Sequence, residues 1–167
     1  MSAMQHQPDG VAFDIVLLLH VACVAVGVVT TATAAATATR LRRLLGSPLP
    51  LPEHLRRYFR PGINWAGRTV YGIPLFGFVL LAMSQGAYAL GQGWVLGGLA
   101  VFAAVALVGE GVLWPVERRL QAALAPTDAV GEPGAPPLDH DATVMARAAV
   151  AALVLLLAGT VLMVAQP

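Results

Sequence analysis

Three charged residues lie inside or at the edge of long apolar stretches, where ionisable side chains are rare. Arg68 falls in the second stretch, Glu110 in the third and Arg147 in the fourth. An ionisable group at the centre of a bilayer costs about 2.5–3.5 kcal/mol on insertion scales, so it needs a partner or a function. We expect the three to meet at one level. They would form either an ion-pair network that locks helices together or a proton- or anion-handling site in which Glu110 titrates.

His20 and Cys23 form a second candidate site, because residues three apart lie on the same face of a helix. Met83, in the second apolar stretch, reaches a similar depth. Imidazole, thiolate and thioether groups suit Cu(I), so these three residues are candidate copper ligands. His20 is also a candidate axial ligand of haem b.

The remaining histidines restrict the haem hypothesis. They lie outside the apolar stretches: His6, His54 and His140. A haem with two protein ligands would therefore need a His20/Met83 pair or a dimer. The alternative is that His20 is a packing residue, hydrogen-bonded to Ser84 or Gln85 as an interhelical polar contact.

Four elements must position these side chains. A membrane-spanning helix needs about 20 mainly apolar residues, and four stretches qualify, over about residues 11–39, 66–90, 94–116 and 142–164. Composition agrees, because only 11% of the 167 residues are charged, against about 25% in an average soluble domain. The sequence predicts an all-α fold, a four-transmembrane-helix bundle that forms a single integral membrane domain over residues 1–167.

The basic residues predict how this bundle is oriented. All ten are arginines, and they fall on one side of the four-span layout. They follow the first span or separate the third from the fourth: Arg40, Arg42, Arg43, Arg56, Arg57, Arg60, Arg68, Arg118, Arg119 and Arg147. Because cytoplasmic loops carry the Lys/Arg excess, we expect a multi-pass membrane protein with both termini outside. Its arginines would face anionic lipid headgroups, and a net charge of +1 gives no field that draws nucleic acid.

The first connection on the arginine-rich side contains a short predicted helix. Pro52 and the Pro61-Gly62 pair bracket residues 52–60. A solvated charged helix is one interpretation. The other is an interfacial helix that inserts its apolar side chains into the headgroup region: Leu55, Tyr58 and Phe59.

The other connections are turns and linkers. Gly91, Gln92 and Gly93 predict a tight turn between the second and third spans. Residues 122–138 are rich in proline and glycine and predict a flexible linker. The fourth helix then has candidate N-cap residues: Asp139, Asp141 and Thr143.

Several residues should fix the ends of the helices at the membrane surface. Asn64 is a candidate N-cap for the second helix. Trp65 and Trp114 are candidate interfacial anchors, because tryptophan favours the headgroup level. Pro74 predicts a kink in the second helix, since proline removes a backbone donor.

Two stretches carry a resemblance to known proteins. They cover residues 60–74 (RPGINWAGRTVYGIP) and residues 110–119 (EGVLWPVERR). With the four-span layout, they resemble a family of predicted bacterial integral membrane proteins of unknown function. His20 in the first span is also distantly similar to the membrane proteins of the copper-resistance D and haem-pathway type. That second similarity implies a haem or copper ligand at His20.

Motifs for common enzymatic chemistry are missing from the sequence. It contains no phosphate-binding glycine loop, no HExxH and no GxSxG. The leading hypothesis is a non-enzymatic structural or accessory membrane subunit, in a homo-oligomer or a larger membrane complex. The alternatives are a haem- or copper-handling protein that uses His20, and a small transporter or proton-coupled carrier centred on Glu110 with Arg68 and Arg147.

Overall fold

The structure, a computed structural model, describes residues 10–45, 50–125 and 138–165. All regular elements within these residues are helical. Four helical stretches are long and apolar enough to cross a membrane: Val11–Leu44, Trp65–Met83, Gly93–Leu124 and Leu138–Ala165. The predicted all-α bundle with four helices able to span a membrane is therefore confirmed.

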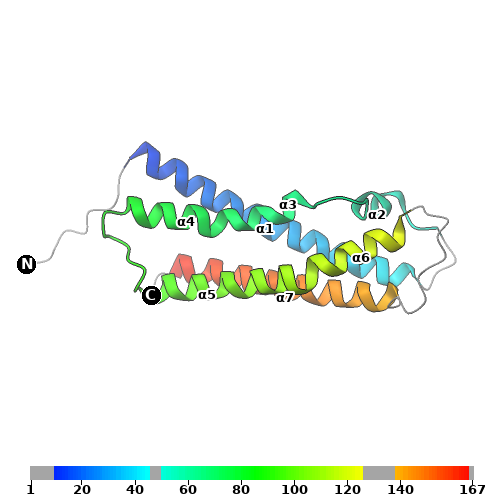
Figure 1. The fold of residues 1–167 in the computed structure, drawn as a ribbon. Helices are drawn as coiled ribbons and strands as arrows, with labels where there is room; N and C mark the ends of the chain where they lie inside the picture. The colour runs from blue at the N-terminus through cyan, green and yellow to red at the C-terminus, as the bar shows by residue number, and fades with distance from the viewer. Residues whose placement is uncertain (1–9, 46–49, 126–137, 166–167) are drawn as a thin grey trace, which may run out of the picture.

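The long helices alternate in direction (Figure 1). α1 (Val11–Leu44) contacts both α4 (Gly72–Met83) and α7 (Leu138–Ala165), and α5 (Gly93–Val108) contacts α7. α1 begins and α7 ends at the same end of the bundle, which we call the terminal end. The opposite end carries the arginine-rich segments, and we call it the basic end.

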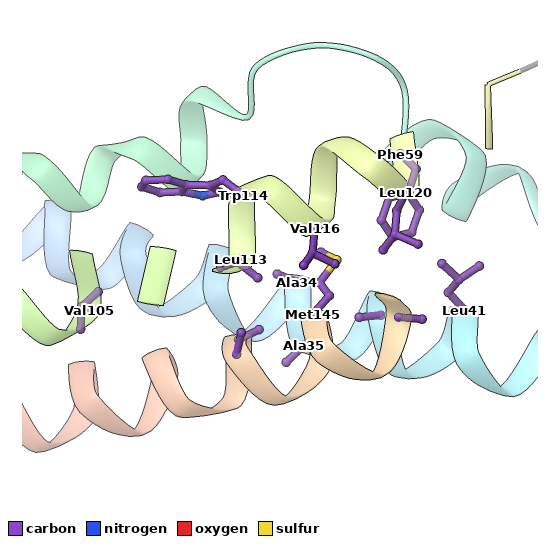
Figure 2. Close-up of a cluster of buried hydrophobic side chains, with 14 of the residues drawn as sticks. Ala34, Ala35, Leu41, Phe59, Val105, Leu113, Trp114, Val116, Leu120 and Met145 are labelled. Atoms are coloured by element: carbon purple, nitrogen blue, oxygen red, sulfur yellow. The ribbon is translucent and has the colours of Figure 1, made fainter. Parts of the chain in front are cut away.

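Most buried side chains lie towards the basic end. We define the basic half as residues 27–45, 50–71, 105–125 and 138–156. Its core contains Leu41, Leu120 and Met145, each 0% exposed. Figure 2 shows that this core draws side chains from α1, from the end of α2 (Glu53–Tyr58), from α6 (Trp114–Leu124) and from α7.

The remaining described residues, 10–26, 72–104 and 157–165, form the terminal half. Among them only Ser84 and Val95 are buried. Many large apolar side chains there are exposed, for example Leu18 (68%) and Val161 (67%). Such a surface suits lipid or another membrane helix, because hydrocarbon chains are as apolar as these side chains.

Glycines bring the helices together in the terminal half. A Cβ added at Gly97 or Gly98 of α5 would collide with Leu162 or Met163 of α7. A Cβ added at Gly72 of α4 would lie 2.5 Å from the Cys23 sulfur of α1. Close approach of backbones at small residues is how membrane helices gain packing energy.

The second span is shorter than predicted. α4 ends at Met83 and not near residue 90, so the connection to α5 covers residues 84–92. The Ser84 hydroxyl donates to the Leu81 carbonyl at 2.8 Å and accepts from the Tyr88 amide at 3.2 Å. Gln85 (φ 50°) and Gly86 (φ 90°) then adopt left-handed conformations that end the helix.

The other spans extend further at the basic end than predicted. The first reaches Leu44, and the third continues through a π-helical turn (η2, Gly109–Leu113) and α6 to Leu124. The fourth begins at Leu138, so residues 122–124 and 138 of the predicted linker are helical. Residues 126–137 of that linker lie outside the described residues.

The predicted helix within residues 52–60 is present as α2 (Glu53–Tyr58), but its apolar face was assigned wrongly. Leu55 is 1% and Phe59 2% exposed, so protein and not lipid covers them. Phe59 belongs to the same core as Leu41 and Leu120 (Figure 2). α2 therefore packs its apolar face against the bundle and closes its basic end.

Two prolines accompany the irregular turns inside the spans. A 3₁₀ turn (η1, Thr69–Tyr71) joins α3 (Trp65–Arg68) to α4 just before Pro74, and the π turn η2 lies just before Pro115. Each proline lacks the N–H that would bond the carbonyl four residues earlier. The irregularity predicted at Pro74 is thus a tightened turn directly upstream of it.

Candidate functional site

The predicted Arg68–Glu110 ion pair is present. Arg68 Nη1 lies 3.4 Å from Glu110 Oε1, and the Tyr71 hydroxyl donates to the same oxygen at 2.8 Å. The Arg68 guanidinium also stacks over Trp114, 4.4 Å from the ring centroid. Arg68 is thus fixed between a carboxylate and an aromatic face, a mainly structural arrangement.

Arg147 does not join this pair, contrary to the prediction. It is exposed on α7 and makes no ion pair within the described part of the chain. The charged pair on α7 is instead Asp141 with Arg119, whose guanidinium donates to both carboxylate oxygens at 2.9 and 3.1 Å. The candidate cap Asp141 is therefore an interhelical ion-pair partner inside α7, which begins three residues earlier at Leu138.

The π turn decides which polar side chains of the third span enter the bundle. In an uninterrupted α-helix, Glu110, Trp114 and Glu117 would share one face, because they are spaced i, i+4 and i+7. Here Glu110 is exposed, whereas Trp114 and Glu117 are buried. A π turn inserts one extra residue and rotates the residues after it by about 100°. Trp114 is consequently a core residue and not the predicted interfacial anchor.

Glu117 is a buried carboxyl group that the sequence pattern did not single out. It is 5% exposed and has no ion-pair partner among the described residues. Its Oε1 accepts a hydrogen bond from Asn64 Nδ2 at 3.2 Å. Asn64 also accepts from the Gly67 amide at 3.0 Å, so its predicted role as an N-cap is confirmed. One side chain therefore caps α3 and holds Glu117.

Tyr58 faces the same carboxyl group from α2. Its hydroxyl is buried without a well-aligned hydrogen-bond partner among the described residues, and Glu117 is the charged group that acts on it. Burial, and then the negative charge of Glu117, raise the pKa of the Tyr58 hydroxyl. The hydroxyl therefore stays protonated and remains available as a donor.

Two cavities meet at these three side chains. A cavity of about 30 Å³ lies among the helices and is lined by Thr30, Thr31, Tyr58, Asn64, Trp114 and Glu117, with apolar neighbours. A larger pocket of about 290 Å³ lies towards the basic end and is lined by Arg60, Ile63 and Gln121, among others. Tyr58, Asn64 and Glu117 line both. Thus they form the boundary between an internal space and an open one.

The candidate cofactor residues are not gathered into one site. His20 Nδ1 lies 2.9 Å from the Ile73 carbonyl oxygen, and because a carbonyl only accepts, Nδ1 carries the hydrogen. This bond replaces the predicted one to Ser84 or Gln85. His20 also packs against Gly77.

Cys23 of α1 and Met83 of α4 lie at different levels of the bundle. The Cys23 sulfur packs against Gly72, whereas Met83 is six residues beyond Gly77, about 9 Å further along the helix axis. No group of three His, Cys, Asp or Glu side chains within the described ranges could hold a metal. His20, Cys23 and Met83 are therefore not gathered into one three-ligand site in the described structure, and the copper and haem hypotheses stay predictions.

Trp65, the other predicted anchor, is 70% exposed at the start of α3. Its predicted role as an anchor at the headgroup level stays a prediction.

No known protein family, curated protein or solved structure matches this chain. The resemblance of residues 60–74 and 110–119 to a bacterial membrane family accordingly stays a prediction.

Proposed function

We propose that this chain is a non-enzymatic structural or accessory subunit of the bacterial inner membrane, with both termini outside. The supporting observation is how the polar groups at membrane level are used. Glu110 binds Arg68 and Tyr71, and His20 binds the Ile73 carbonyl. These side chains hold neighbouring helices together and do not converge on a substrate-sized space. The internal cavity of about 30 Å³ has room for water but not for an organic solute.

The arginines support the proposed orientation and lipid contact. All of them except Arg68 are exposed, and they cluster at the basic end. Guanidinium groups at a membrane surface attract anionic headgroups by about 1 kcal/mol each. An impermeant thiol reagent tests the orientation in a Cys23→Ala background. Gly10→Cys should react from outside intact cells and Arg118→Cys should not. The reverse pattern would show that both termini lie inside the cell.

The exposed terminal half is where a partner helix would bind. A photo-crosslinking amino acid can replace one exposed residue on each long helix: Leu18, Phe78, Leu96 and Val161. In native membranes, a partner should give a discrete protein adduct from helices on one side of the bundle. An adduct of twice the chain mass identifies a homo-oligomer. Ala38, which is 0% exposed, is the matched control and should give no intermolecular adduct. Absence of adducts from all four exposed sites would refute the subunit proposal.

The haem- and copper-handling alternative has its own test. It requires a Soret band or stoichiometric copper in detergent-purified protein, lost in His20→Ala. Since His20 is bonded to the second span and its predicted co-ligands lie elsewhere, we expect neither signal.

A further inference from the structure

Glu117 differs from Glu110 and Asp141, two carboxyl groups on the third and fourth spans, because it has no ion-pair partner among the described residues. Glu110 has Arg68, and Asp141 has Arg119. Glu117 is buried with one amide donor, from Asn64, and the neighbouring Tyr58 hydroxyl. A carboxylate that leaves water without an ion-pair partner is destabilised relative to its neutral acid. Its surroundings thus favour uptake of a proton.

The groups around Glu117 on each packed element are mostly neutral. Thr30 and Thr31 of α1 and Ala152 of α7 line the inner cavity, and Gln121 of α6 lines the outer pocket. The nearby charges belong to Arg118, the next residue of α6, to Arg68, which stacks over Trp114 of the inner cavity, and to Arg60 at the outer pocket. In the described structure, no guanidinium nitrogen of these arginines lies within 4 Å of a Glu117 carboxylate oxygen. They therefore form no closed ion pair with Glu117.

The Glu117 carboxyl group lies between an outer pocket, from which a proton can arrive, and an inner cavity. The outer pocket of about 290 Å³ reaches the basic end, where water supplies protons. The inner cavity of about 30 Å³ is large enough for a water molecule and is lined in part by Thr30 and Thr31. Glu117, Asn64 and Tyr58 are common to both linings.

We propose that Glu117 is a proton-binding site at the boundary between the inner cavity and the pocket at the basic end, with Asn64 and Tyr58 as positioning residues. A hydronium ion that enters the outer pocket from solvent breaks one of its O–H bonds and becomes water, as one Glu117 oxygen forms an O–H bond and the carboxylate becomes a neutral carboxylic acid. Asn64 holds one oxygen by its amide, and the Tyr58 hydroxyl is the second available donor. This proposal is independent of whether the chain is an accessory subunit.

Infrared spectroscopy of the purified full chain in lipid nanodiscs, titrated with pH, tests the proposal. The carbonyl stretch of a protonated carboxyl group should persist at pH values where exposed carboxyl groups have ionised. Glu117→Gln should remove this band, and Glu110→Gln, the matched control on the same span, should retain it. A wild-type protein without the band, or a band that survives in Glu117→Gln, would overturn the proposal.

Tyr58→Phe provides a second measurement that does not require the Glu117 variant to fold. Without the Tyr58 hydroxyl, the Glu117 carboxylate loses its second available hydrogen-bond donor. The pH midpoint of the carboxyl band should therefore move upward by about one unit. Asn64→Ala should move it in the same direction. Unchanged midpoints in both variants would show that the titrating group lies elsewhere, which also contradicts the proposal.

Discussion

The basic and terminal halves of the bundle are held together by different contacts. In the basic half, large side chains such as Leu41, Leu120 and Met145 interlock and are fully buried. In the terminal half, helices touch through glycines such as Gly72 and Gly98, and many of their large side chains are exposed. The basic half thus resembles the core of a soluble protein. The terminal half obeys the rule for helices in lipid, where close backbone approach replaces hydrophobic burial.

The two halves also treat polar groups differently. The basic half contains the two ion pairs found among the described residues, Arg68–Glu110 and Arg119–Asp141, as well as the buried Glu117. In the terminal half, the described side chains make one interhelical hydrogen bond, from His20 to the Ile73 carbonyl. Specific side-chain contacts between helices are therefore concentrated at the arginine-rich end.

The largest expected effect compares truncations in the two halves. Met145→Ala should lower the free energy of unfolding by about 2–5 kcal/mol, because it leaves a cavity in a fully buried core. Leu18→Ala, at a position that is 68% exposed, should change it by no more than about 0.5 kcal/mol. Denaturant unfolding in detergent measures both. Equal losses would show that the halves are not distinct.

The glycine contacts of the terminal half are tested at Gly72. Gly72→Ala should destabilise the protein by about 1–3 kcal/mol, because its Cβ would overlap the Cys23 sulfur. Cys23→Ala in the same chain should recover most of that loss by making room. Thermal unfolding of the two single variants and the double variant gives the coupling energy. Additive effects would mean that this contact does not hold α1 against α4.

The ion pairs should differ in strength within the basic half. Arg119→Gln should cost about 1–2 kcal/mol, because it leaves the buried Asp141 carboxylate without its two charged hydrogen bonds. Glu110→Gln should cost less than about 1 kcal/mol, since the Glu110 side chain is 53% exposed. Unfolding midpoints at low and high salt measure the difference. A larger loss in Glu110→Gln would reverse this ranking.

The smallest effect is expected at Arg147. Its side chain is exposed and has no ion-pair partner in the described structure, so Arg147→Gln should alter stability by no more than about 0.5 kcal/mol. The measurement is again the unfolding midpoint in detergent. A loss of stability as large as that in Arg119→Gln would instead support the predicted network of Arg68, Glu110 and Arg147.

Local patterns were sufficient for much of the basic end. Asn64 comes after a proline-glycine turn and precedes an apolar run, and it caps α3 as predicted. The opposite charges of Arg68 and Glu110, both near the arginine-rich ends of their spans, predicted their contact correctly. Glu117 was missed because the predicted third span ended at residue 116, one residue before it. Pro115 was the available signal, since a proline inside a helix favours an irregular turn just before it.

The sequence by itself determined four apolar helices and the gathering of every arginine at one end. Both result from hydropathy and charge along the chain, which are local properties. Tertiary structure alone decided that α2 packs inward, that Asp141 pairs with Arg119, and that Glu117 and Trp114 are buried while Glu110 is exposed. The physical reason is geometric. One extra residue in the π turn rotates the later side chains of the third span by about 100°. Which face of that span becomes buried therefore depends on the neighbouring helices and not on the pattern of residue types.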